Sequence, residues 1–182
     1  PSAEGVYRHI MAIVEATDLP VMIYDIPGRT GVRITDETLA RLAEHERILA
    51  VKDATGDVEQ GFRRMEATGL EYYSGDDGLN FAWLAHGASG VVSVVAHADA
   101  HSWREMITEV DAGDLAGARA VARRIRPLVQ AIMGGGQGAV MAKEALLLQG
   151  RIPSAALRLP LVRAEADEVA ALRAVLDASG LL

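Results

Sequence analysis

Cysteine is absent from this sequence of 182 residues. Its absence excludes a disulfide framework, a zinc site built on thiolates and a cysteine nucleophile, and it fits a reducing compartment. No apolar run reaches the ~18 residues that a membrane-spanning helix requires, and no segment has the features of a signal peptide. We therefore expect a cytoplasmic protein with no membrane partner.

Positive charge is also scarce. The chain has 18 basic and 25 acidic side chains and a formal net charge of -7, which argues against nucleic acid as a partner. Half of the residues are hydrophobic, which at this length is enough for one sizeable core. The first residues, from Pro1 onward, resemble the middle of a loop, so we expect the chain to be a fragment of a longer protein.

Four short apolar segments predict β-strands that begin near residues 21, 48, 71 and 91. Their apolar character is nearly continuous, which is typical of a parallel sheet covered on both faces. The strongest of the four is Val91 to Val95. Helical periodicity separates the strands, and after Asp99 the pattern is helical only. The predicted helices span residues 4–16, 35–43, 57–68, 79–85, 101–112, 114–133, 139–149 and 164–178, with glycines 134 to 136 ending the sixth.

The alternation of strands and helices predicts an α/β fold. Four βα units followed by helices suit the second half (strands 5–8) of a (β/α)8 TIM barrel with a C-terminal all-helical extension, because a complete barrel needs ~250 residues. We assign residues 1–112 to the C-terminal half of the barrel and residues 113–182 to the helical region. The alternative is a small flavodoxin-like or Rossmann-type sheet, which the lack of a Gly-x-Gly-x-x-Gly turn disfavours.

One lysine occupies an unusual position. Lys52 ends the apolar run that starts at Ile48, and Tyr24 ends the apolar run before it. In a barrel the carboxyl ends of the strands meet at one face, which carries the site. A lysine there is desolvated, which favours the uncharged amine that attacks a ketone, and a neighbouring tyrosine can carry protons. The alternative, favoured by composition alone, is that Lys52 extends from a strand end into water.

Other polar groups near the strand ends have simpler interpretations. Arg29, in the loop after the first strand, would suit a substrate carboxylate, although a solvated loop arginine is the simpler interpretation. His97 and His101 have the spacing of a metal-binding pair on a helix, but no third ligand stands in register. We therefore expect no metal site.

Four segments near the strand ends form a recognisable set: YDIPGRTG at 24–31, VKDATG at 51–56, SGDD at 74–77 and GVVSV at 90–94. In this order and at these spacings they resemble the dihydrodipicolinate synthase family, which is part of the pyruvate-dependent class I aldolases. The resemblance spans essentially the whole chain and is specific as a set. Relatives such as N-acetylneuraminate lyase share the tyrosine and the lysine, whereas Arg29 favours the synthase family.

The resemblance implies a reaction and a role for each residue. Lys52 would condense with pyruvate to an imine and then an enamine, which attacks L-aspartate 4-semialdehyde to give 4-hydroxy-tetrahydrodipicolinate in lysine (diaminopimelate) biosynthesis. Tyr24 would relay protons, and Arg29 would hold the semialdehyde carboxylate or organise the entrance. Gly75 and the carbonyl of Val92 would line the pyruvate pocket. The resemblance implies no metal or organic cofactor, and it implies a homotetramer built from tight dimers.

The chain departs from the family pattern at two points. Its first residues resemble the family segment just after the fourth strand, so the threonine pair that binds the pyruvate carboxylate and a second tyrosine are missing, and we expect complete activity to require that N-terminal half. Asp25 stands where asparagine is frequent in the family. Two alternatives stay open: another pyruvate-dependent aldolase acting on a sugar or keto acid, or a non-catalytic barrel fragment that serves as an assembly or binding module.

Overall fold

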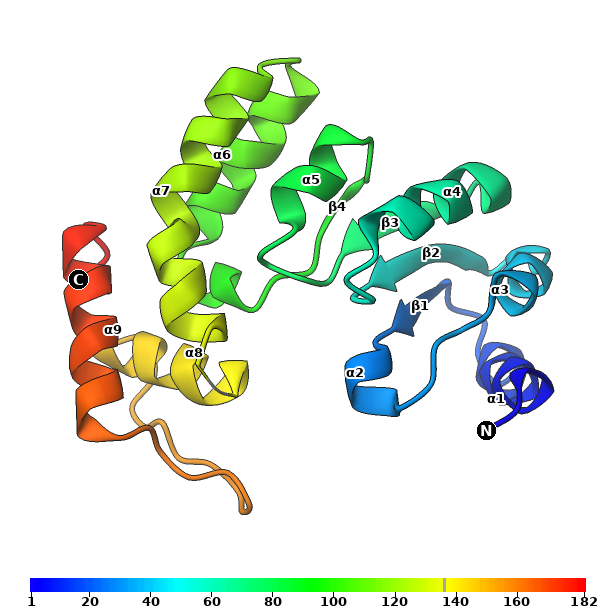
Figure 1. Cartoon of the computed structure of the whole chain (residues 1–182). Helices are drawn as coiled ribbons and strands as arrows, with labels where there is room; N and C mark the ends of the chain where they lie inside the picture. The colour runs from blue at the N-terminus through cyan, green and yellow to red at the C-terminus, as the bar shows by residue number, and fades with distance from the viewer. Residues whose placement is uncertain (136) are drawn as a thin grey trace. The chain divides into compact units, whose positions relative to one another are not determined.

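Strands and helices alternate along the first half of the chain, as its apolar segments predicted (Figure 1). The computed structural model describes residues 1–135 and 137–182, and these fall into two units, residues 1–92 and residues 93–182. The elements of the first unit are α1 (Ala3–Glu15), β1 (Val21–Asp25), α2 (Pro27–Thr30), α3 (Asp36–Ala43), β2 (Ile48–Asp53), α4 (Val58–Thr68), β3 (Glu71–Ser74), α5 (Asn80–Ala85) and β4 (Gly90–Val91).

The four strands form one parallel sheet in the sequential order β1-β2-β3-β4. The register places Tyr24 of β1 opposite Lys52 of β2, and it places Asp25 opposite Asp53 one residue further along. β3 pairs with β2 on one side and with β4 on the other, again in parallel. A parallel sheet whose strands are joined by helices confirms the predicted α/β fold.

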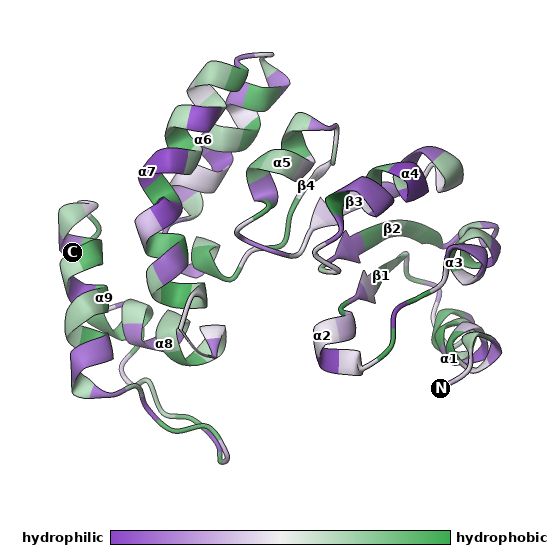
Figure 2. Cartoon of the chain, viewed as in Figure 1, coloured by the Kyte–Doolittle hydropathy of each residue, from purple (hydrophilic) through white to green (hydrophobic). Residues whose placement is uncertain are grey.

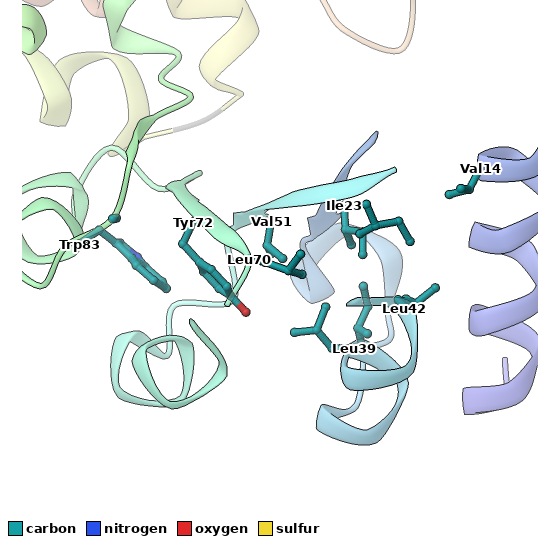
Figure 3. Close-up of a cluster of buried hydrophobic side chains, with 11 residues drawn as sticks. Val14, Ile23, Leu39, Leu42, Val51, Leu70, Tyr72 and Trp83 are labelled. Carbon is teal, nitrogen blue, oxygen red and sulfur yellow. The ribbon is translucent and has the colours of Figure 1, made fainter. Parts of the chain in front are cut away.

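The core of this unit lies between the sheet and its helices. Ile23 of β1 and Val51 of β2 belong to a buried cluster with Leu39 and Leu42 of α3 and Trp83 of α5 (Figure 3). Full burial of an aliphatic side chain of this size stabilises a fold by ~1.5–3 kcal/mol. This cluster therefore fixes the positions of α3 and α5 on one face of the sheet.

The opposite face of the sheet is open. Met22 and Tyr24 are 42% and 41% exposed, although both lie on strand β1. The physical reason is topological: right-handed crossovers between strands in sequential order place all the connecting helices on the same side. The prediction that the sheet is covered on both faces is therefore wrong for the described part of the chain.

Side chains predicted to cap helices do so. The Thr35 hydroxyl accepts a hydrogen bond from the Thr38 N–H at 3.2 Å, and the Asp57 carboxylate accepts one from the Gln60 N–H at 3.1 Å. Gly69 ends α4 in the left-handed conformation, with φ of 65°, which only glycine adopts at little cost. These caps set the lengths of the connections that bring each strand back to the sheet.

Strand β4 is shorter than the sequence predicted. It covers Gly90–Val91, whereas Val95–His97 forms the short 3-10 helix η1. The Ser93 hydroxyl accepts a hydrogen bond from the Ala96 N–H at 2.9 Å, which turns the backbone away from the extended course. The prediction of a strand through Val95 is therefore wrong, because a capped turn overrides the β-propensity of the valines.

The second unit is helical, and its elements after η1 are α6 (Ala100–Asp111), α7 (Leu115–Met133), α8 (Gly138–Leu148) and α9 (Ala166–Ala178). α7 continues through Pro127 to Met133 and is followed by Gly134, while Gly136 lies outside the described residues. The buried Glu144 of α8 accepts two hydrogen bonds from Arg163, at 2.8 and 2.7 Å. In the part of the chain that the structure describes, no helix combines the length and the hydropathy of a membrane span.

The contact between α4 and α5 gives a testable prediction. A Cβ at Gly61 would lie 2.0 Å from Cη2 of Trp83, which is itself fully buried. We expect Gly61→Ala to lower the free energy of unfolding by ~1–3 kcal/mol because the clash outweighs the gain in helix propensity. Urea denaturation measures the effect. Gly28→Ala, where a Cβ meets nothing within 4 Å, is the matched control, and equal stability of the two variants would contradict the packing.

Candidate active site

Lys52 and Tyr24 lie side by side at the carboxyl ends of β2 and β1. They are register partners, and the Lys52 Nζ lies 3.8 Å from the centroid of the Tyr24 ring. Paired residues of a parallel sheet project from the same face, and here that face is the open one. The structure therefore brings together the amine and the phenol that the sequence singled out, and both can be reached by a small molecule.

The hydropathy of the strands changes where these groups lie. The body of β2 is hydrophobic, whereas the ends of β1 and β2 are hydrophilic (Figure 2). Those ends carry Tyr24, Asp25, Lys52 and Asp53. Polar groups therefore gather at the carboxyl edge of the parallel sheet, which is where ligands bind in α/β folds.

Gly75 provides the space that the Lys52 side chain occupies. A Cβ at this position would lie 2.9 Å from Cε and 3.0 Å from Cγ of Lys52, and 3.1 Å from Cβ of Ala54. The Gly75 N–H donates a hydrogen bond to the Asp53 carbonyl at 2.7 Å, which holds the glycine beside β2. The sequence implied that Gly75 lines a pyruvate pocket, and the structure places it directly against the stem of the lysine.

The other two predicted site residues lie on segments that follow the strands. Arg29 is exposed on α2, a single helical turn that Gly31 ends with φ of 73°. The Thr30 hydroxyl donates to the carbonyls of Ile26 and Val32, which holds this turn just beyond β1. Val92 follows β4, and its N–H donates to the Ser74 carbonyl at 2.8 Å. Their roles toward a substrate stay predictions.

A buried polar layer lies directly behind the open face. Asp25 and Asp53, one residue beyond Tyr24 and Lys52, project from the covered face and are both buried. Arg64 of α4 is buried with them and donates to Asp25 Oδ2 at 3.1 Å. Arg64 was not singled out from the sequence. It follows Gly61 by three residues and shares its helix face, but that this face is buried is known from the structure and not from the sequence.

The two buried carboxyls have perturbed acidities. Burial raises the pKa of Asp25, although the Ile34 N–H and the Arg64 guanidinium act in the opposite direction. Burial also raises the pKa of Asp53, although its hydrogen bonds from Thr55 act against that shift. The Thr55 bonds go to Oδ1 of Asp53, and Oδ2 has no hydrogen-bond partner among the described residues. Asp53 therefore carries a negative charge at an energetic cost.

His97 and His101, whose spacing is that of a metal-binding pair on one helix, lie on two different helices. His97 lies in η1, where its Nδ1 is 2.8 Å from the Val94 carbonyl, and His101 lies in α6. Within residues 1–135 and 137–182, no three His, Asp or Glu side chains have an arrangement that would hold a metal ion.

Comparisons with known proteins point to one family. The model of the dihydrodipicolinate synthetase family matches residues 1–179. The 4-hydroxy-tetrahydrodipicolinate synthases of Kineococcus radiotolerans and Bifidobacterium animalis subsp. lactis are 50% and 45% identical to this chain; both matches cover 100% of it, and they cover 59% and 60% of those proteins. The solved dihydrodipicolinate synthase of Thermotoga maritima is 38% identical with a TM-score of 0.94, over 100% of this chain and 63% of that one. The chain thus spans about 60% of the length of the curated relatives it matches.

The acidity of Asp53 gives a prediction of pH dependence. Because burial raises its folded pKa above the unfolded value, the stability contribution of Asp53 is complete below about pH 4 and is lost as the pH rises through the folded pKa. Asp53→Asn keeps an acceptor for Thr55 but cannot ionise. We expect its free energy of unfolding, relative to the wild type, to increase between pH 4 and pH 8, as measured by urea denaturation.

Asp57→Asn is the control with the opposite sign. The Gln60 N–H, followed by Arg33, lowers the pKa of this half-buried cap, so the stability contribution of Asp57 is present above the unfolded pKa and is lost as the pH falls through the folded pKa. Parallel pH curves for the two variants would contradict the assignment of Asp53 as a carboxyl that burial destabilises in its charged form.

Proposed function

Because this chain belongs to the dihydrodipicolinate synthetase family, we propose that it carries the Schiff-base part of a 4-hydroxy-tetrahydrodipicolinate synthase site. The observation that carries the proposal is the contact between the Lys52 amine and the Tyr24 ring at the carboxyl edge of a parallel sheet. The proposed substrates are pyruvate and L-aspartate 4-semialdehyde. The reaction belongs to lysine biosynthesis, and Lys52 itself serves as the electron sink.

The proposed chemistry follows from the position of the amine. The uncharged Lys52 Nζ adds to the ketone carbon of pyruvate, and loss of water leaves an imine. Removal of a methyl proton gives an enamine, whose carbon attacks the aldehyde carbon of the semialdehyde. The amino group of the second substrate then attacks the imine carbon, which closes the ring and releases Lys52. Each step moves a proton, and Tyr24 is the nearest group of suitable type on the same face.

Three further residues have proposed roles around this pair. Gly75 leaves room for the lysine stem, so that the amine can reach the carbonyl carbon. The Val92 carbonyl, beyond β4, lines the pyruvate pocket. Arg29, on the exposed turn after β1, binds the carboxylate of the semialdehyde or organises the entrance, because a guanidinium suits a planar carboxylate.

We further propose that residues 1–112 form the C-terminal half of a (β/α)8 barrel and that residues 113–182 form a C-terminal helical region. The sequential strand order, the helices on one face and the open second face support this proposal. An apolar groove of about 470 Å³ runs along β1 and α1, where a further strand would pair with the edge of the sheet. Four strands cannot close a barrel, so complete activity needs the remaining strands.

The whole enzyme is proposed to be cytoplasmic and homotetrameric. The lack of cysteine is consistent with a reducing compartment. The helical region after residue 112 presents Leu115 and Val162 to solvent, which suits a contribution to contacts between subunits.

The Schiff base gives the first prediction on activity. The protein, expressed with all eight strands of the proposed barrel, is incubated with pyruvate and borohydride, and the reduced adduct is mapped by mass spectrometry. We expect the label on Lys52. The only other lysine of this chain, Lys143, donates to the Ala156 carbonyl and serves as the internal control. Lys52→Arg should abolish labelling and Lys143→Arg should preserve it; a label on Lys143 alone, or none, would refute the proposed chemistry.

The acceptor aldehyde is tested in the same preparation. We expect turnover with L-aspartate 4-semialdehyde and none with N-acetylmannosamine, because Arg29 offers a partner for a carboxylate that the sugar lacks. The reverse preference would assign the chain to a sugar-type aldolase while leaving the lysine chemistry intact.

Gly75 gives a prediction that separates activity from stability. In Gly75→Ala the new methyl group displaces the flexible Lys52 stem, so we expect kcat/KM for pyruvate to fall by ~10- to 100-fold. The free energy of unfolding should change by less than ~1 kcal/mol, because the lysine can move aside. Gly78→Ala, three residues along the same loop, is the matched control. Full activity of Gly75→Ala would show that the Lys52 position is not restricted.

A further inference from the structure

The end of β1 is anchored from behind by a single buried side chain. Arg64 donates from Nη1 to Asp25 Oδ2 at 3.1 Å, from Nε to Asp36 Oδ1 at 2.6 Å and from Nη2 to the Ile34 carbonyl at 2.6 Å. The Ile34 N–H is 3.4 Å from the other oxygen of Asp25. One guanidinium on α4 thus connects the last residue of β1 with the start of α3.

The position of this anchor relates it to the open face. Asp25 is the next residue after Tyr24, and Asp53 is the next residue after Lys52. α4, which carries Arg64, directly follows β2 and its turn. Arg64 therefore connects the strand of the phenol to the βα unit of the amine, on the side of the sheet opposite to the reacting groups.

The charges around Asp25 make this anchor hard to replace. The groups that act on Asp25 are Arg64 from α4, Asp53 from β2, Tyr72 from β3, and Arg33 and the Ile34 N–H from the segment before α3. Asp36, the first residue of α3, binds the same guanidinium of Arg64. Arg64 is 5% exposed and Asp25 is 3% exposed. Removal of one partner of such a pair leaves a buried charge without compensation, which perturbs the structure more than loss of both partners.

We propose that Arg64 is a positioning residue of this site, whose ion pair with Asp25 fixes the end of β1 so that the Tyr24 ring stays over the Lys52 amine. The catalytic consequence rests on the proposed function. Displacements of ~1 Å in a reacting group can cost ~100-fold in rate, even when the mutated residue is remote from the chemistry. Arg64 contacts neither reacting group and acts through the strand.

The test compares two adjacent arginines of α4. Arg64→Gln removes the buried guanidinium, whereas Arg63→Gln removes one that is 66% exposed and is paired with Glu59 one turn earlier on the helix. In the protein with all eight strands we expect Arg64→Gln to lower kcat at least about tenfold, with KM for pyruvate changed less than about threefold. Arg63→Gln should keep the wild-type kcat. Wild-type kcat in Arg64→Gln would overturn the proposal.

The pH dependence of the loss of kcat in Arg64→Gln shows whether the ion pair positions the site or whether the variant only packs less well. Without Arg64, Asp25 keeps the Ile34 N–H but loses the guanidinium that is buried beside its carboxylate. The charged form of Asp25 is then less well compensated than in the wild type, so the loss of kcat should grow as the pH rises. Asp25→Asn in the Arg64→Gln background removes the ionisable group and should restore kcat to within about threefold of Asp25→Asn alone. A loss that is equal at every pH and is not restored by Asp25→Asn would overturn the role of the pair.

Two comparisons keep the outcomes distinct. If Arg64→Gln does not fold, we compare kcat of Asp25→Asn with kcat of the double variant Asp25→Asn/Arg64→Gln. A tenfold lower kcat in the double variant would overturn the proposal, because Arg64 would then act without Asp25. A wild-type protein that forms no pyruvate adduct at Lys52 would refute the proposed function instead. The thermal unfolding midpoint of the same variants between pH 5 and pH 9 requires no turnover and tests the ion pair in either case.

Discussion

The parallel register between β1 and β2 is the constraint on which the site depends. It sets Tyr24 beside Lys52 on the open face and Asp25 beside Asp53 on the buried face. A slip of β2 by one residue against β1 would turn Lys52 toward the core side chains and Asp53 toward the open face. The polar layer on the buried face favours this register, since it contains the hydrogen bond from Arg64 to Asp25.

The same register explains why Lys52 and Tyr24 reduce the stability of the fold only slightly. Lys52 needs no buried counter-ion, because its face of the sheet is open and Gly75 leaves space for its stem. The cost appears instead on the other face, where Asp53 keeps one carboxylate oxygen without a hydrogen bond in the described part of the chain. Burial makes a negative charge on Asp53 unfavourable. Arg64 forms its ion pair with the neighbouring Asp25 and not with Asp53, so Asp25 is the better compensated of the two carboxylates.

The features that were predicted correctly from the sequence are those set by residues close together in the chain. The strand starts, the caps at Thr35 and Asp57 and the pairing of Tyr24 with Lys52 follow from apolar runs and capping residues. Arg64 could not be assigned a partner in this way, because Asp25 lies 39 residues away in the chain. The length of β4 was misjudged for a related reason: a serine-capped turn decides where its valine run leaves the sheet, and propensity alone does not register it.

The most direct test of the central claim is a crystal structure of the protein, with all eight strands of the proposed barrel, soaked with pyruvate. The proposed mechanism predicts continuous electron density between the Lys52 Nζ and the former ketone carbon, with the Tyr24 hydroxyl on the same side of the sheet and the Asp25–Arg64 pair intact. Pyruvate bound without a covalent bond to Lys52, or joined to another amine, would contradict it.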